Sequence, residues 1–114
     1  MGQLEEIHQL EKAIDRNQGN SLLVFYKVEL ARARYLTKDY RSALEVLEPL
    51  RIAFEAKLVR DACLARLGEL SDAEREANRN SDVRIDQVRM RSSMEDRDQL
   101  DFWAQGLRLV GYRS

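Results

Sequence analysis

The chain has 114 residues, enough for one domain of ordinary size, and its hydrophobic fraction of 44% excludes a disordered polar tail. Its formal net charge of −1 lacks the basic excess with which duplex-binding proteins displace counterions, so we expect no nucleic-acid partner. Half of the residues, 57, are Ala, Leu, Glu, Lys or Arg and only one is Pro, which predicts an all-α protein.

Apolar residues at helical spacing predict a first helix over residues 4–16, followed by a polar turn in which Gly19 is a left-handed C-cap. The second helix, over residues 21–37, is apolar on several sides, so we expect neighbouring helices on both of its flanks. Asp39 is predicted to cap a third helix, and Pro49 is predicted to end it because proline lacks an amide donor.

A fourth helix is predicted over residues 53–67, and Gly68 closes it. Ser71 or Asp72 then opens a short fifth helix that ends near residue 79, because short polar side chains favour the N-cap position.

Residues 80–97 are predicted to form a polar spacer that contains one short helix at residues 85–90. The last helix is predicted over residues 98–111, with Asp98 as its N-cap. Trp103 belongs to its apolar face, and we expect this face to pack against the other helices.

Two stretches of the sequence, residues 30–44 and 60–74, resemble each other with a period of 30 residues. Each stretch ends one helix, turns within a few residues and places an alanine, Ala43 or Ala73, early in the next helix. Two antiparallel helices joined by so short a turn approach closely, so only a small side chain fits where they cross. We therefore expect both alanines to lie at a helix crossing.

This pattern resembles the tetratricopeptide repeat (TPR), with departures that make the array degenerate. Lys38 replaces the turn glycine of the first unit, Arg60 and Asp61 replace the usual Leu and Gly of the second, and the usual period is about 34 residues. The resemblance implies a right-handed stack of antiparallel helical hairpins, a TPR-like α-solenoid, within a single domain over residues 1–114. Its parts are the end of a preceding repeat (4–20), a first repeat (21–50), a second repeat (53–79), the polar spacer (80–97) and a capping helix (98–111).

A broader resemblance rests on residues 35–43, 62–73 and 106–111. Their order is similar to the C-terminal TPR region of bacterial class III adenylate cyclase-like proteins and of TPR-tailed regulators. The resemblance implies an accessory region of a larger signalling protein, whose catalytic or DNA-binding domain would lie upstream.

The chain has few residues with which to carry out chemistry. His8 is its only histidine, so no histidine pair can bind a metal. Cys63 is its only cysteine and lies in an alanine-rich segment, which predicts a buried small hydrophobe and suits a reducing compartment. We find no phosphate-binding glycine loop and no signal peptide or apolar run long enough to cross a bilayer. We therefore predict a non-enzymatic cytoplasmic protein without cofactor, metal or membrane contact.

The predicted function is protein–protein interaction or regulation, because stacked helical hairpins form a concave groove that binds a peptide or a partner domain. The residues that the repeat pattern places in this groove are Phe25, Val28, Arg32, Tyr35, Leu58, Ala62 and Arg66. The two arginines favour an acidic peptide, whereas the basic run around Arg34 is interleaved with acids and predicts an ion-paired face. Self-association as a homodimer stays open as the alternative.

Overall fold

A computed structural model describes residues 3–50, 54–87 and 96–114 of the chain. These residues form helices and turns with one isolated β-bridge and no strand, which confirms the prediction of an all-α protein. Contacts divide the chain into two compact units, Met1–Cys63 and Leu64–Ser114. Among the described helices, none combines the length and the apolar character that crossing a membrane requires.

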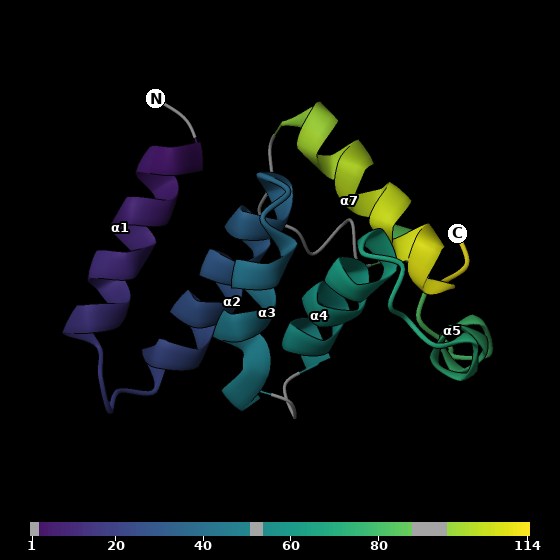
Figure 1. The fold of residues 1–114 in the computed structure, drawn as a ribbon, viewed down its shortest axis with the longest axis horizontal. Coiled ribbons are helices and arrows are strands. Elements are labelled where there is room, and N and C mark those ends of the chain that lie inside the picture. The colour runs from purple at the N-terminus through teal and green to yellow at the C-terminus, as the bar shows by residue number, and fades with distance from the viewer. Residues whose placement is uncertain (1–2, 51–53, 88–95) are drawn as a thin grey trace. The chain divides into compact units, whose positions relative to one another are not determined.

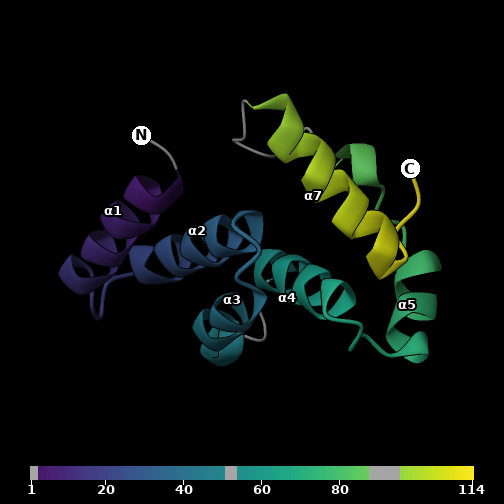
Figure 2. The same ribbon diagram turned by 45° about the horizontal axis from the view of Figure 1, so that its top comes forward.

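In the first unit, α2 (Leu22–Leu36) packs against both α1 (Gln3–Arg16) and α3 (Tyr40–Leu47) (Figure 1 and Figure 2). This arrangement agrees with the apolar residues on several sides of α2. The small core where the three helices meet consists of Ile7, Leu30 and Ala33 with the partly buried Leu10, Ile14 and Val46.

The turn between α2 and α3 contains Lys38, whose φ of 66° is positive. The amide of Lys38 donates to the carbonyl of Tyr35 at 3.0 Å, and the amide of Asp39 donates to the carbonyl of Arg34 at 2.9 Å. This pair of hydrogen bonds is the Schellman motif, which satisfies the last carbonyls of a helix. Lys38 therefore adopts the backbone conformation of the glycine that it replaces.

Ala43 is completely buried in α3, as expected for a residue at a helix crossing. Next to it, the rings of Tyr35 and Tyr40 lie 5.5 Å apart, so the two ends of the turn also touch. The α-helix ends at Leu47, and Pro49 lies in a 3₁₀ turn (Glu48–Leu50), as the missing amide of proline predicts.

The fourth helix, α4 (Phe54–Arg66), ends in a second turn of the same kind. Gly68 has a φ of 73°, its amide donates to the carbonyl of Ala65 at 3.1 Å, and the next amide donates to the carbonyl of Leu64 at 2.8 Å. The predicted start of this helix at Ala53 lies outside the described residues.

The fifth helix, α5 (Asp72–Arg79), begins where predicted, and the hydroxyl of Ser71 accepts a hydrogen bond from the amide of Glu74 at 3.1 Å. The expectation for Ala73 is wrong, because this alanine is exposed. The physical reason is that α5 starts at Asp72, 32 residues after α3 starts, although the turns repeat at 30. Ala73 therefore lies in the first turn of α5 and at no buried crossing.

The second unit contains α5 and the last helix, α7 (Arg97–Val110), which contact each other. Its N-cap is Asp96, whose carboxylate accepts hydrogen bonds from the amides of Asp98 and Gln99, so the prediction of Asp98 as the cap is wrong by two residues. Either aspartate suits an N-cap chemically, and the sequence alone does not separate them. Trp103, with Leu107 and Val110, is buried as predicted.

Side chains of α5 fix the end of α7. The side-chain amide of Asn78 donates to the backbone carbonyl of Val110 at 3.3 Å, and the guanidinium of Arg75 donates to the backbone carbonyl of Leu109 at 3.0 Å. Gly111 ends the helix at a φ of 116°, and a Cβ at this position would lie 2.4 Å from the backbone oxygen of Arg75. Glycine is therefore required there by both conformation and space.

The predicted polar spacer is described in part. The amide of Ile85 donates to the carbonyl of Arg113 at 2.8 Å, next to a β-bridge that joins Arg84 and Arg113. Helical backbone begins at Ile85, but the remainder of the short helix predicted at 85–90 lies outside the described residues after residue 87.

Candidate functional site

The first turns of α2 expose large apolar side chains. Phe25 is 58% exposed and Val24 43% exposed, and Leu22 beside them is also exposed. The ring of Phe25 meets the ring of Tyr26 edge-on at a centroid distance of 5.5 Å, a favourable geometry for an aromatic pair. Apolar side chains gathered at a surface are a feature of binding sites, whereas single exposed ones need no explanation.

Val24 and Phe25 line a hollow of about 350 Å³ between the first turns of α2 and the start of α4. Phe54, which is 44% exposed, contributes the opposite wall. We call this hollow the Phe25 pocket; its lining residues are Ser21, Val24, Phe25, Val28, Glu29, Phe54 and Glu55. Its volume is at the lower end of small-ligand pockets, roughly 300–1,000 Å³, and is sufficient for one or two side chains of a peptide.

The acidic edge of the Phe25 pocket is held by one arginine. Nη1 of Arg32 pairs with Oε1 of Glu29, and Nη2 pairs with Oε2 of Glu55 at 3.1 Å. The Arg32 side chain is 11% exposed, whereas that of Glu55 is 57% exposed. A single guanidinium therefore connects α2 to α4 and neutralises one of two carboxylates.

The structure brings together only part of the predicted groove. Phe25 and Val28 line the Phe25 pocket, although Val28 is itself buried, and Arg32 lies behind its acidic edge. Tyr35, Leu58 and Ala62 are buried, which corrects the expectation that they offer a binding surface. Tyr35 is a core residue instead, because α2 is packed on two sides.

Arg66 belongs to the second unit, where its guanidinium lies 4.0 Å from the centroid of the Phe102 ring. It also donates a hydrogen bond to the Phe102 carbonyl at 2.9 Å. The expectation that Arg32 and Arg66 are available to an acidic peptide is therefore not supported, since both guanidinium groups are engaged within the chain. The predicted ion-paired face is present, because Arg34 lies 3.5 Å from both Glu11 and Asp39.

Sequence reasoning missed Val24, Phe54, Glu29 and Glu55 as pocket residues. The 30-residue period contained a usable signal, since it aligns Val24 with Phe54 and Phe25 with Glu55. The first turns of α2 and α4 are therefore equivalent positions of the repeat, and both line the pocket.

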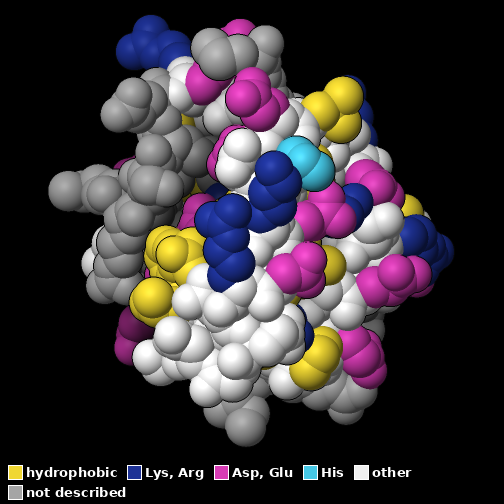
Figure 3. Space-filling model, turned by 90° about the vertical axis from the view of Figure 1, so that its left-hand side faces the viewer, with side chains coloured by type: hydrophobic (Ala, Val, Ile, Leu, Met, Phe, Trp, Pro, Cys, Tyr) yellow, Lys and Arg dark blue, Asp and Glu magenta, His cyan; other side chains and the backbone are white. Residues whose placement is uncertain are grey.

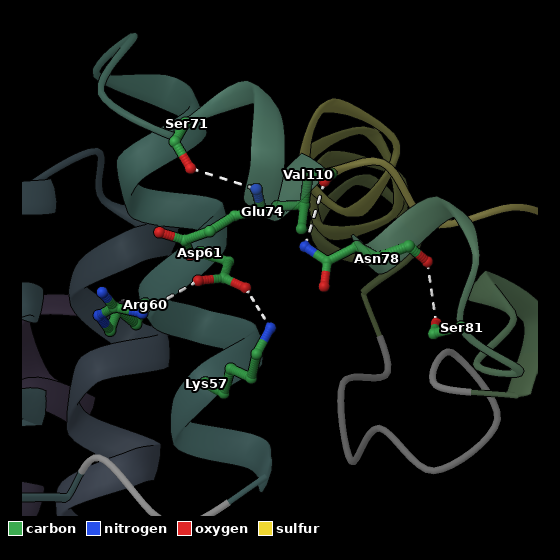
Figure 4. Close-up of polar contacts among 8 residues, drawn as sticks. All are labelled: Lys57, Arg60, Asp61, Ser71, Glu74, Asn78, Ser81 and Val110. Atoms are coloured by element: carbon green, nitrogen blue, oxygen red, sulfur yellow. Dashed lines mark hydrogen bonds and ion pairs between the residues drawn. The ribbon is translucent and has the colours of Figure 1, made fainter. Parts of the chain in front are cut away.

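A second cluster lies further along α4, around the completely buried carboxylate of Asp61. Nζ of Lys57 is 2.6 Å from Oδ2 and Nη1 of Arg60 is 3.3 Å from Oδ1, and Figure 4 shows both contacts. Lys57 and Arg60 also line a smaller hollow of about 160 Å³ with Leu47, Leu50 and Ala56. A buried carboxylate needs such partners, so the cluster is explained by the stability of the fold.

Burial raises the pKa of the Cys63 thiol from 9.0 to about 12, so the group stays protonated at neutral pH and is a poor nucleophile. His8 is exposed on α1. Among the described residues, no group of three His, Cys, Asp or Glu side chains is placed to hold a metal ion. On the α1 side of the molecule, acidic and basic side chains are intermingled (Figure 3).

No model of a known protein family matches this chain, and no curated protein and no solved structure matches it either. The TPR resemblance therefore stays a prediction that rests on the residues and on their spacing.

Proposed function

We propose that this chain is a non-enzymatic interaction module that binds a peptide segment of a partner protein in the Phe25 pocket. The observation that carries the proposal is the group of exposed apolar side chains, Val24, Phe25 and Phe54, around one hollow. Covering these side chains would remove apolar area from water, which stabilises a complex by about 25 cal/mol per Å² before the costs of association.

We further propose that the helices form TPR-like hairpins in a right-handed stack, as an accessory region of a larger signalling protein. The first part is supported by the repeated turn, in which Lys38 and Gly68 have positive φ angles and equivalent hydrogen bonds. The second part is supported by the sequence resemblance alone.

The test is a selection from a random-peptide display library, followed by titration of the selected peptides against three forms of the protein. Phe25→Ser removes the largest exposed side chain of the pocket and should weaken binding by about tenfold or more, since about 1.4 kcal/mol corresponds to tenfold. Leu109→Ser is the matched control, because Leu109 is 46% exposed but belongs to α7 in the second unit. The Leu109→Ser variant should bind the selected peptides as tightly as the wild type does.

Two outcomes would overturn the proposal. In the first, the library yields no peptide whose binding depends on Phe25. In the second, light scattering shows a dimer that Phe25→Ser dissociates, which would assign the pocket to self-association instead.

A further inference from the structure

The charge of the Phe25 pocket narrows the chemistry of its occupant. Among the described residues that line the pocket, the charged ones are Glu29 and Glu55. Lys27 lies two positions from Phe25 and from Glu29 on the same helix, and residues two apart on a helix do not face each other. The described charged residues that line the pocket are therefore acidic.

Arg32 reduces this negative charge without cancelling it. The guanidinium pairs with both carboxylates, so two negative charges share one positive charge and a net charge of −1 remains. The Arg32 side chain is largely covered, while the Glu55 side chain is the most exposed member of the group. Each carboxylate oxygen accepts more than one hydrogen bond, so Glu55 can bind a second cation while it keeps its contact with Arg32.

We propose that the occupant of the Phe25 pocket is a basic peptide segment, with a Lys or Arg next to the apolar side chain that enters the pocket. This inference rests on the proposed function and specifies the class of partner. The apolar side chain supplies most of the affinity, and the cation beside it pairs with Glu55, which sets specificity and raises the association rate. An acidic peptide would place like charges together and would bind less well.

The experiment repeats the library selection with charge variants of the pocket edge. The wild type should enrich peptides that carry Lys or Arg beside the apolar anchor. Glu55→Gln should weaken a selected basic peptide by about threefold, as for one exposed ion pair, and Glu55→Lys by about tenfold. Selection against Glu55→Lys should enrich Asp or Glu at the flanking position. Raising the salt concentration should weaken the wild-type complex more than the Glu55→Gln complex.

Glu45→Lys is the matched control, because Glu45 is an exposed acid of α3 that does not line the pocket. It changes the net charge by the same amount and should leave both the affinity and the selected sequences unchanged. Glu29→Gln gives a second route to a weaker charge at the edge if Glu55→Lys unfolds the protein, which circular dichroism would detect.

The outcomes separate this inference from the function on which it rests. Peptides that depend on Phe25 but carry no excess of Lys or Arg would overturn the charge inference and leave the interaction module standing. A library that yields no peptide dependent on Phe25 would overturn the interaction module, and the charge inference with it. Loss of affinity in Glu45→Lys equal to that in Glu55→Lys would show that only the net charge of the protein matters, which also overturns the inference.

Discussion

The turn after α2 and the turn after α4 have the same hydrogen bonds at a spacing of 30 residues, yet the helices that follow begin at different points. In the first turn α3 starts at Tyr40, directly after the cap, and Ala43 is buried. In the second turn α5 starts only at Asp72, after an extended Ser71, and Ala73 is exposed. The repeat thus preserves how a helix ends and not where the next one begins.

The largest effect expected at neutral pH uses the two alanines of the repeat. Ala43→Leu should reduce the free energy of unfolding by about 1–3 kcal/mol, because the buried site has no room for three more carbons. Ala73→Leu should stay within about 0.5 kcal/mol of the wild type, because its site faces solvent. Urea unfolding of both variants measures the difference. Equal losses would place Ala73 at a crossing and would contradict the difference in register.

The second comparison concerns Cys63 and its repeat equivalent Ala33, which are both buried. Below pH 9 the thiol is protonated in the native and the unfolded chain, so stability does not depend on it. Above pH 9 the unfolded thiol ionises, while the native thiol resists ionisation up to about pH 12. The free energy of unfolding should therefore fall by up to about 1.4 kcal/mol per pH unit in this range.

The control is Cys63→Ala, which introduces the alanine found at the equivalent position 33 and removes the thiol. Other groups that titrate at high pH are common to both forms, so the difference between the two unfolding curves isolates the thiol. Parallel curves between pH 9 and about pH 12 would contradict the raised pKa.

Lys38 and Gly68, the positive-φ residues of the two equivalent turns, give an effect of about 1 kcal/mol in opposite directions. Gly68→Ala should destabilise the protein, although a Cβ at this position would have no atom within 4 Å, because the left-handed conformation alone is strained. Lys38→Gly should stabilise it by about 0.5–1 kcal/mol. Lys38→Ala is the reference for the second change, since it removes the side chain and keeps the strain. Thermal unfolding of the wild type, Gly68→Ala, Lys38→Gly and Lys38→Ala measures these differences in stability. If Lys38→Gly is no more stable than Lys38→Ala, the turn at Lys38 is unstrained.

The smallest effect compares the two N-caps. Ser71→Ala removes the hydrogen bond to the Glu74 amide and should cost about 0.5–1 kcal/mol. The side chain of Asp39 makes no capping bond and pairs instead with Arg34 at 3.5 Å, so Asp39→Ala should cost only a few tenths of a kcal/mol. A larger loss for Asp39→Ala than for Ser71→Ala would reverse this assignment.

The sequence allowed the helices to be predicted because their signals are local. Gly68, Gly111 and Pro49 mark helix ends through their own backbone preferences, and the structure agrees at these three positions. Gly19 has the predicted positive φ, but it lies in the turn three residues after α1 ends and not at the cap of that helix. The start of α5 was predicted, but the exposure of Ala73 was not, because the 30-residue period aligns this alanine with the buried Ala43 and no local signal shows what covers it. The error at the cap of α7 arose because Asp96 and Asp98 are equally suitable as N-cap residues.

The candidate site was predicted only in part, because a sequence pattern does not show which surfaces neighbouring helices cover. Helical periodicity shows that α2 has apolar residues on several sides, but it does not show which side a neighbour covers. Tyr35 proved buried and Phe25 exposed, although both are aromatic residues of α2. The charge of the pocket depends on the pairing of Arg32 with Glu55, 23 residues away in the sequence, and such contacts are not visible in a pattern.

The buried thiol of Cys63 also has a practical consequence for measuring occupancy of the pocket. A protonated and inaccessible thiol does not react with maleimides at neutral pH, so the native cysteine need not be removed before labelling. A cysteine introduced in place of the exposed Val24 would then be the one reactive thiol among the described positions. A fluorophore attached there, whose emission responds to polarity, would report when an apolar side chain enters beside it.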